Sequence, residues 1–439
     1  MTKILLITIF LFSSLIYANY ADTYGISSEE ISKGNAVTAT VNNWSSAYYN
    51  IAGLGKTKYL KNKKQTNELA VSYMYTLPLL NLNIEKETNA TKDLKFGTIT
   101  FGVAIDIRNF INLPKMISSA RFGMIMGMMQ DGTLARVNDL DIRSHSFLRY
   151  GRDIQRAVIF SGLGLGFNND MFGIGFGANI WTTGKGKIKM SNLELNSGKQ
   201  IPSSQTQLDL SPKMAPVVGF YFSYADFDLG FSYKHELYMD LPLETNAAML
   251  LAGVEMALEL YVTDFYTPTS LTLGLAYKFS DLTLSIDVEY QMWSNFVKSK
   301  SAQNFVEIYN KDNGDKEDIV LPEMKDIIIP KIGISYSGLK DFRFNAGYYY
   351  RPTFLPDDAG KTFYNFMDSN AQVISLGVNY IIPKNSVLVA SMELNFTTQF
   401  QILSSKDVIK SADFVSDLNP DYNFNGTVIS IFAEILMRW

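Results

Sequence analysis

The 439-residue chain contains no cysteine, only two histidines and, beyond its N-terminus, no apolar run long enough to span a bilayer as a helix. Without cysteine, thiolate catalysis, a lipid anchor on cysteine and any disulfide framework are excluded. The best helical candidate, residues 247–260, is interrupted by Glu255 and Glu259, whereas a transmembrane helix needs roughly 20 mostly apolar residues. The formal net charge of −4 gives no electrostatic basis for nucleic-acid binding.

The few residues able to carry catalysis are poorly arranged for it. His145 lies in Ser144-His145-Ser146, the only hydroxyl–imidazole pair, but adjacent residues of a strand point to opposite faces of a sheet. No His, Asp and Glu cluster has metal-ligand spacing, and no phosphate-binding glycine loop occurs. We therefore predict that the protein is not an enzyme and has no catalytic residues, metal or cofactor.

Residues 1–18 have the pattern of a secretory signal peptide. Lys3 provides the positive charge, residues 4–16 form the apolar core, and Ala18 offers a small residue for cleavage. An exported protein without a membrane helix is periplasmic, secreted or a barrel of the outer membrane.

Apolar and polar residues alternate over about 10 positions at a time along most of the chain, as in the strands of a membrane barrel. In residues 283–293, Leu284, Ile286 and Val288 alternate with Ser285 and Asp287. A soluble β-sandwich also alternates, but here the strands recur to the last residue and their apolar faces end in Tyr, Phe or Trp, as in an aromatic girdle. We therefore predict a barrel, and the same pattern occurs in residues 69–75, 271–279, 341–351, 374–380, 388–396 and 431–439.

Length sets the expected strand number and domain boundaries. A signal peptide at residues 1–18 and a plug at residues 19–60 leave residues 61–439 for the barrel. This length suits about 14 strands, an even number as in single-chain bacterial barrels. Four charge-rich stretches are predicted loops, namely residues 61–64, 81–95, 298–318 and 404–421.

Residues 24–54 (YGISSEEISKGNAVTATVNNWSSAYYNIAGL) resemble neither a strand nor a long helix. This small-residue-rich stretch lies between the signal peptide and the first strand, where a compact segment would plug the barrel lumen. We expect its conspicuous side chains to touch a ligand or act as a gate; the alternative is that they only anchor the plug to the wall. These residues are Trp44, Tyr48, Tyr49, Asn50 and Ala52.

Three ordered parts of the chain resemble the FadL/TodX family of outer-membrane transporters for long-chain fatty acids and other hydrophobic compounds. They are the plug with Asn50-Ile51-Ala52-Gly53, the stretch from Pro268 through Phe279 to Val288–Phe296, and Phe342–Tyr348 followed by Pro352, Leu355-Pro356-Asp357, Asp368 and Ile374–Tyr380. One departure is notable, because relatives usually carry Asn-Pro-Ala where this chain has Asn50-Ile51-Ala52. Loss of the proline removes a fixed φ, so we expect the plug to be less rigid or differently folded there.

The resemblance implies an all-β fold, a transmembrane antiparallel β-barrel of about 14 strands with an N-terminal hatch inside the lumen, in a bacterial outer membrane. It also implies passive transport of long-chain fatty acids or aromatic hydrocarbons, with capture at extracellular loops and lateral release. Independently, the polar lumen faces of most strands disfavour a greasy solute, so an apolar path must involve the loops, the hatch and a lateral exit. The alternative function is a general porin for polar solutes.

Residues 113–129 (LPKMISSARFGMIMGMM) are rich in methionine, a soft residue that is frequent where one surface accepts varied apolar partners. Pro114 suits a helix start, and Met116, Ala120, Met124 and Met128 recur at a spacing of four residues. We predict an extracellular loop that forms a hydrophobic capture groove; the alternative is a transmembrane strand with the even-numbered residues from Phe122 on facing lipid. The predicted ligand-binding residues are Met116, Phe122, Met124, Ile125, Met126, Met128 and Met129.

Residues 161–179 are predicted to form a hairpin whose strands each present glycines on one face, with Asn168-Asn169-Asp170 at the turn. Glycine weakens a strand and often marks close approach of another backbone. We predict a flat wall where the hatch packs or a substrate passes; simple packing around a crowded lumen is the alternative. The glycines are Gly162, Gly164, Gly166, Gly173, Gly175 and Gly177.

The expected partners are a hydrophobic small molecule, outer-membrane lipid and the assembly machinery of the outer membrane. The last would read the C-terminal strand, which ends in Trp439 rather than the more usual Phe. A fatty-acid carboxylate would need a cation or hydrogen-bond donors. Arg121, Arg343 and Arg351 are the candidates, and the sequence does not choose among them.

Overall fold

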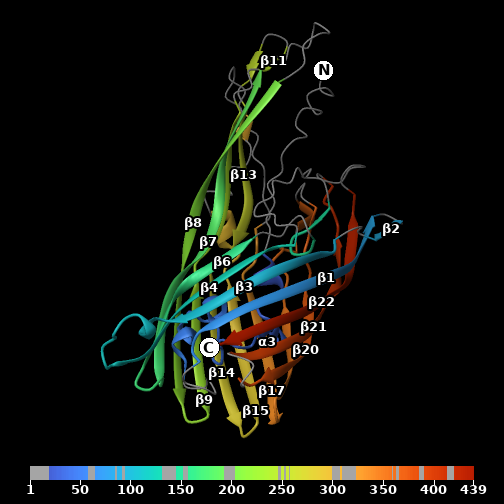
Figure 1. The fold of residues 1–439 in the computed structure, drawn as a ribbon. Coiled ribbons are helices and arrows are strands. Elements are labelled where there is room, and N and C mark those ends of the chain that lie inside the picture. The colour runs from blue at the N-terminus through green and yellow to red at the C-terminus, as the bar shows by residue number, and fades with distance from the viewer. Residues whose placement is uncertain are drawn as a thin grey trace.

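The alternating segments form the wall of one closed barrel, with the N-terminal segment folded inside it (Figure 1). The computed structural model describes residues 19–57, 65–84, 87–90, 94–130, 145–151, 157–191, 203–245, 249–251, 254–256, 258–298, 307–308, 323–357, 359–361, 365–384, 390–412 and 420–439. The predicted signal peptide and the predicted loop at residues 61–64 lie outside these ranges. No helix in the described part of the chain is long and apolar enough to cross a membrane.

The wall contains 14 antiparallel strands, as predicted, and each pairs with the wall strand that follows it in the chain. The barrel closes where β22 pairs with β1, from Glu68 opposite Arg438 to Ile84 opposite Tyr422. The wall strands are β1 (Glu68–Ile84), β3 (Phe96–Asp106), β4 (Ile117–Met129), β6 (Val158–Phe167), β7 (Phe172–Ser191), β8 (Ser203–Tyr224), β9 (Phe227–Lys234), β14 (Ser270–Phe279), β15 (Leu282–Gln291), β17 (Ile327–Leu339), β18 (Phe342–Arg351), β20 (Ala371–Ile382), β21 (Ser391–Val408) and β22 (Tyr422–Arg438).

The two ends of the barrel differ. At one end, which we call the turn end, tight turns such as Asn168–Asp170 connect the strands, and these three residues have φ values of 50°, 55° and 62°. At the other end, the loop end, β7 and β8 rise far above the rest of the wall (Figure 1). Short turns at one end and longer loops at the other are the rule in membrane barrels.

Short elements decorate the loop end and the turn end. The hairpin of β10 and β13 continues β9 and β14 upward, and β10 also pairs with the extended part of β7. The remaining elements are β2 (Glu87–Ala90), β5 (Ser146–Phe147), β10 (Leu237–Thr245), β11 (Met249–Leu251), β12 (Val254–Met256), β13 (Leu258–Thr267), β16 (Glu307–Ile308), β19 (Phe366–Met367), η2 (Ile107–Asn109), α5 (Asn295–Lys298) and η3 (Ala359–Lys361).

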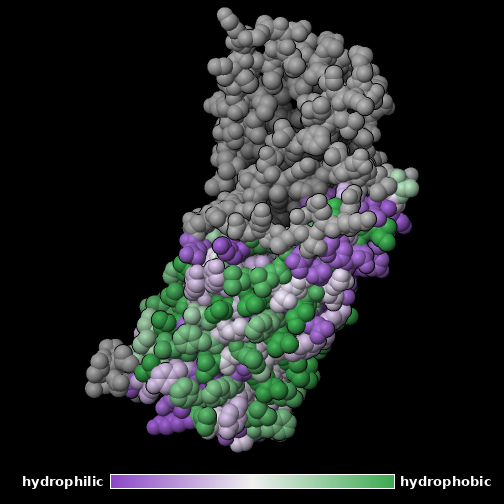
Figure 2. Space-filling model, turned by 90° about the vertical axis from the view of Figure 1, so that its right-hand side faces the viewer, coloured by the Kyte–Doolittle hydropathy of each residue, from purple (hydrophilic) through white to green (hydrophobic). Residues whose placement is uncertain are grey.

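The outer surface of the wall is an apolar band. On β15, Ile286 and Val288 are 47% and 45% exposed, whereas Asp287 between them is fully buried. Figure 2 shows this apolar band on one face of the barrel, with hydrophilic residues at its borders. The strand alternation therefore separates a lipid-facing surface from a polar lumen, as the sequence predicted.

Two predicted loops are shorter than expected, because β1 continues to Ile84 and β21 to Val408. Beyond the apolar band, amides pair across the ladder between β1 and β22. Asn81 Nδ2 donates to Asn425 Oδ1 at 3.3 Å, and Asn83 Nδ2 donates to Asn423 Oδ1 at 3.1 Å. Polar, charge-rich sequence was therefore misread as loop where the strands extend into water.

The hatch, residues 19–57, consists of single helical turns joined by bends, as its composition predicted. It contains α2 (Tyr20–Tyr24), α3 (Ser28–Ser32), α4 (Ser46–Tyr49) and η1 (Ile51–Gly55). Asn19 begins α2 by accepting a hydrogen bond from the amide of Asp22 at 2.8 Å. The hatch leaves the lumen at the turn end, where the amide and hydroxyl of Thr57 both donate to Asp170.

Candidate functional site

The glycine wall of β6 and β7 is the surface on which η1 of the hatch packs. A Cβ on Gly164 would lie 2.7 Å from the carbonyl oxygen of Ile51, and one on Gly175 would lie 2.5 Å from the amide nitrogen of Ala52. The side chain of Ile51 fills the space beside Gly162 and Gly177. These strands therefore carry glycine where the hatch backbone approaches the wall.

Glycines on other strands continue this surface around the lumen, and sequence reasoning missed them. Apart from Gly123, which shares the inner face of β4 with Gly127, each occurs alone on the inner face of its strand, and no alternating run of glycines marks it. Gly102 faces Trp44, Gly123 faces Leu54, Gly219 faces Asn50, Gly230 and Gly274 face Thr38, Gly333 faces Lys33, Gly347 faces Gly34, and Gly377 faces Ser32.

The predicted gate residues are anchored inside the hatch. Tyr48 Oη donates to the carbonyl oxygen of Ala21 at 2.9 Å, and Tyr49 Oη donates to Asn35 Oδ1 at 2.6 Å. The side chain of Asn50 accepts from the amide of Ala52 at 3.2 Å and thereby caps η1. These contacts favour the anchoring role that the sequence left open.

The position where relatives carry proline is an ordered turn here. Ile51 begins η1 without help from a fixed φ, and its fully buried side chain packs against the glycine wall. Apolar packing thus supplies local order at the position where we expected a less rigid or differently folded plug.

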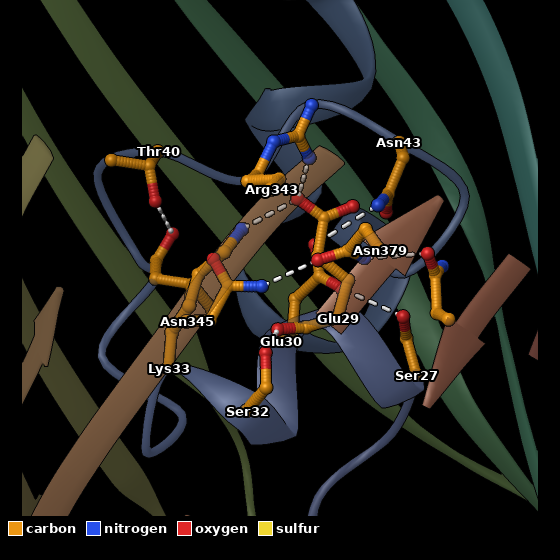
Figure 3. Close-up of polar contacts among 12 residues, drawn as sticks. Ser27, Glu29, Glu30, Ser32, Lys33, Thr40, Asn43, Arg343, Asn345 and Asn379 are labelled. Atoms are coloured by element: carbon orange, nitrogen blue, oxygen red, sulfur yellow. Dashed lines mark hydrogen bonds and ion pairs between the residues drawn. The ribbon is translucent and has the colours of Figure 1, made fainter. Parts of the chain in front are cut away.

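A chain of alternating charges, which we call the ion chain, fastens the hatch to the wall (Figure 3). On the hatch, Glu29 pairs with Lys33 at 2.7 Å and with Arg343 of β18. Burial alone would favour the neutral acid, but Arg343 and Lys33 hold the pKa of Glu29 well below its usual range. Paired, hydrogen-bonded charges of this kind fix the position of the hatch relative to the wall, because charge-assisted hydrogen bonds are strong and depend on geometry.

The ion chain continues along the inner wall. Arg343 Nη1 lies 3.4 Å from Glu393 of β21, and Glu393 lies 2.5 Å from Arg438 of β22. Arg438 pairs with Glu68 of β1 at 3.0 Å, and Glu68 lies 3.6 Å from the fully buried Arg121 of β4.

The far end of the ion chain also binds the hatch backbone. Glu68 Oε2 accepts from the amide of Trp44 at 2.6 Å. Arg121 donates to the carbonyl oxygens of Leu54, at 2.6 Å, and Asn42. Arg121 and Arg343, two of the three predicted carboxylate partners, are therefore engaged in holding the hatch.

The methionine-rich segment is a wall strand, so its predicted placement in an extracellular loop was wrong. Residues 117–129 form β4, and Met116 lies in the bend that precedes it at the turn end. Phe122 and Met124 are exposed on the outer surface, Met126 and Met128 are half-buried on the same side, and Ile125 and Met129 are buried. Strands of this wall alternate between lipid and lumen, so the even-numbered methionines face lipid, which was the alternative interpretation.

Above the hatch, at the loop end, lies a buried apolar cluster that sequence reasoning did not assign to a site. The ring of Trp293 stacks on that of Phe354, with centroids 3.9 Å apart and planes 13° apart. The family motifs quoted above contain Trp293 but not Phe354, which directly precedes Leu355-Pro356-Asp357, so the sequence carried a signal for only one partner of this stack. The cluster also contains Leu148, Trp181, Leu237, Tyr266, Phe296, Met324, Ile327, Ile329, Tyr349, Leu355, Phe366 and Val373.

Two arginines lie at the base of this apolar cluster. Arg149 Nε donates to Asp368 at 3.1 Å, and its guanidinium lies 4.8 Å from the ring centre of Phe354. Burial and the neighbouring Arg351 lower the pKa of Arg149 to about 10. Arg351 Nη2 donates to Tyr150 Oη at 2.8 Å and lies 3.8 Å from Asp368.

Arg351 has hydrogen-bonding capacity to spare. It is 2% exposed, and its Nε and Nη1 atoms have no hydrogen-bond partner within the described residues. It lines a small polar cavity of about 30 Å³ together with Tyr349, Asp22 and Lys331. Because a buried water needs roughly 10–15 Å³, this cavity has room for about two waters or the oxygens of one carboxylate.

His145 of the only predicted hydroxyl–imidazole pair packs edge-on against Tyr422, with ring centroids 4.5 Å apart. Ser144 lies outside the described residues. Among the described residues, no group of three or more His, Cys, Asp or Glu side chains is placed to hold a metal ion.

Comparison with known proteins finds similarity in both sequence and fold. No family model matches the chain. A curated relative, alkane uptake protein A of Marinobacter nauticus, is 21% identical over 412 residues, covering 90% of this chain and 86% of the relative.

Solved structures resemble the whole chain. A Pseudomonas aeruginosa FadL homologue has a TM-score of 0.54 at 12% identity, covering 98% of this chain and 99% of that chain. The Ralstonia pickettii toluene transporter TbuX gives 0.53 at 13% identity, covering 95% and 99%. The P. putida toluene transporter TodX gives 0.52 at 12% identity, also covering 95% and 99%. The predicted likeness to FadL and TodX is confirmed for the fold.

Proposed function

We propose that this chain is a passive outer-membrane transporter of hydrophobic small molecules, such as long-chain fatty acids or hydrocarbons. The observation that carries the proposal is a lumen filled by the hatch, with a buried apolar cluster directly above it. The similar proteins named above are transporters of toluene, a FadL homologue and an alkane uptake protein. Their names agree with an apolar cargo.

The lumen around the hatch favours a plugged carrier over an open pore. The glycines of the wall bring its backbone against the hatch, and the ion chain occupies the polar space beside it. An apolar solute would gain nothing from this polar interior. We propose that it is captured at the loop end, where the apolar cluster lies, and released sideways into the bilayer.

For a fatty acid, Arg351 is the best of the three predicted carboxylate partners. Arg121 and Arg343 are engaged with the hatch, whereas Arg351 lies beside the apolar cluster with two uncommitted donor atoms. A carboxylate there would form charge-assisted hydrogen bonds, which are roughly twice as strong as neutral ones. The chain above the carboxylate would lie against Trp293 and Phe354.

The remaining predicted partners and the location fit the same proposal. The apolar outer band would contact outer-membrane lipid, with the turn end in the periplasm. The C-terminal strand β22, which ends one residue before Trp439, would be the part read by the outer-membrane assembly machinery.

Native mass spectrometry with solvent extraction of protein purified from outer membranes tests this function. The proposal predicts a co-purified fatty acid or hydrocarbon that is lost when Trp293 and Phe354 are both changed to Ser. A ligand-free protein with large, steady single-channel currents in a planar bilayer would instead identify a porin.

A further inference from the structure

Two buried carboxyl groups accept hydrogen bonds from adjacent residues at the start of α3, and neither is paired with a cation among the described residues. Glu30 accepts hydrogen bonds from Ser27 Oγ at 2.6 Å and from Asn43 Nδ2 at 2.9 Å. Glu434 of β22 accepts from the amide of Ser28 at 2.9 Å and from Asn395 Nδ2 at 3.0 Å. Both glutamates are 2% exposed, and neither forms an ion pair within the described residues.

The charges around this pair leave one negative charge in excess. The ion chain contains three carboxylates and four cations, because Lys33, Arg343, Arg438 and Arg121 face Glu29, Glu393 and Glu68. Adding Glu30 and Glu434 gives five carboxyl groups against four cations. Two like charges buried at one contact disfavour ionising both groups, and one proton on either Glu30 or Glu434 makes the cluster neutral.

Other titratable groups at this contact do not supply the missing positive charge. The phenol of Tyr49 on α4 is influenced by the charges of both glutamates, and burial raises its pKa. Lys33 and Arg343 lie beside Glu29, which they neutralise. The described residues offer no metal cluster at this position either. A proton is therefore the simplest positive charge that completes the contact.

Water reaches the edge of this contact from the turn end. A vestibule of about 390 Å³ lies between the hatch and the wall and is lined by Glu29, Glu30, Lys33 and Arg343, among others. Protons can therefore exchange with Glu30 without passing the apolar cluster at the loop end.

We propose that Glu30 and Glu434 form a proton-dependent latch, which holds α3 against β22 while one of the two is protonated and releases α3 when that proton is lost. The part that moves is α3 with its following turn, which packs where Gly377 faces Ser32 and Gly347 faces Gly34. The opposite side of the hatch stays fixed by Arg121 and the glycine wall of β6 and β7. Loss of the proton leaves two buried negative charges in repulsion across this one contact.

The direction of the pH response follows from linkage. Burial and the neighbouring Glu29 raise the pKa of Glu30 to about 7 from the ordinary value of 4.5. A group with a raised pKa stabilises the docked state at low pH, and this stabilisation is lost as pH rises through the raised value. The latch therefore holds below about pH 7 and weakens above it.

A single cysteine measures this release, because the natural chain has none. Ser32→Cys places a thiol that is buried while α3 is docked. The alkylation rate of this thiol is measured in the folded protein, in detergent, at each pH. It is compared with the rate in the double variant that carries both Ser32→Cys and Glu434→Gln. Both proteins carry the same thiol, so the pH dependence of thiolate formation cancels in the ratio.

The latch predicts equal rates at pH 6 and, at pH 9, a rate about tenfold or more higher in the protein that retains Glu434. One proton released on opening changes the opening equilibrium up to about tenfold per pH unit. Glu30→Gln should suppress the rise in the same way and serves if Glu434→Gln folds poorly. Asp170→Asn, which removes another buried carboxyl that holds the hatch, should keep the rise. The latch would be overturned if the ratio of the two alkylation rates did not change with pH. It would also be overturned if Asp170→Asn suppressed the rise at high pH as strongly as Glu434→Gln does.

Discussion

Gly102 of β3 lies directly against the indole of Trp44, so closely that a Cβ at this position would overlap the ring. The amide of Trp44 meanwhile donates to Glu68 on the neighbouring strand β1. Hatch and wall are therefore shaped to one another at this point, because a glycine on the wall admits the largest buried side chain of the hatch.

Replacing Gly102 by Ala should displace Trp44 and loosen the hatch. Overpacking a buried contact costs about 1–3 kcal/mol, and we expect a lower midpoint of thermal unfolding. The matched control is Gly97→Ala on the same strand, where the new Cβ would meet the movable ends of Tyr73 and Gln130. Equal effects of the two substitutions would show that the Trp44 contact is not tight.

Glu68→Gln should be strongly destabilising, since it leaves the fully buried Arg121 without its carboxylate. Breaking a buried ion pair from one side costs roughly 3–5 kcal/mol. The double variant Glu68→Gln with Arg121→Met should recover part of that loss, as measured by denaturant midpoints. If the double variant loses the sum of the two single losses, the residues do not act as a pair.

The methionines of β4 should behave as lipid-facing residues. Met124→Leu should change stability by less than about 1.5 kcal/mol and leave uptake unchanged. Met124→Arg should cost about 2–4 kcal/mol near the bilayer midplane. Refolding into lipid vesicles measures both, and a specific loss of uptake in Met124→Leu would restore a ligand-binding role for this strand.

Arg351→Gln should weaken transport of fatty acids but not of hydrocarbons of the same length. A hydrogen bond to a charged group contributes about 1.5–3 kcal/mol, which corresponds to roughly a 10- to 150-fold loss of affinity. Lys325→Gln, at an exposed ion pair with Asp357, is the control for a general loss of positive charge. Equal uptake losses for acids and hydrocarbons would assign Arg351 a structural role only.

Local pattern was sufficient to predict the wall and the hatch. Strands such as β15 bury one face and expose the other, so alternation with a period of two residues in the sequence predicts each wall strand. The hatch was recognisable because residues 24–54 lack such a period and are rich in small residues.

The error at β4 arose because a spacing of four residues also fits a period of two. Met116, Ala120, Met124 and Met128 share one face of a helix and also one face of a strand. The intervening Gly123, Ile125 and Gly127 lie on the lumen side, and this alternation of sides identifies a strand rather than a helix. Arg121 was predicted as a carboxylate partner because it lies near the methionines in the sequence, whereas its side chain is on the inward face and contacts the hatch.

Contacts between distant segments could not be predicted from one sequence. Ser28 and Glu434 are 406 positions apart yet share a hydrogen bond, and nothing local marks either residue. Trp293 and Phe354 likewise meet only because β15 and β18 are brought to the same end of the barrel. Such contacts are determined by the strand register of the closed barrel, which no local stretch of sequence reveals.

A plugged barrel of this kind should carry apolar rather than polar solutes. The most direct measurement is double-label uptake by cells that express the protein, using a long-chain hydrocarbon and a small sugar in the same sample. Compared with cells that lack the protein, we expect a faster initial rate of hydrocarbon uptake and an unchanged rate of sugar uptake. A faster rate for the sugar, with the hydrocarbon unchanged, would contradict it and identify an open pore.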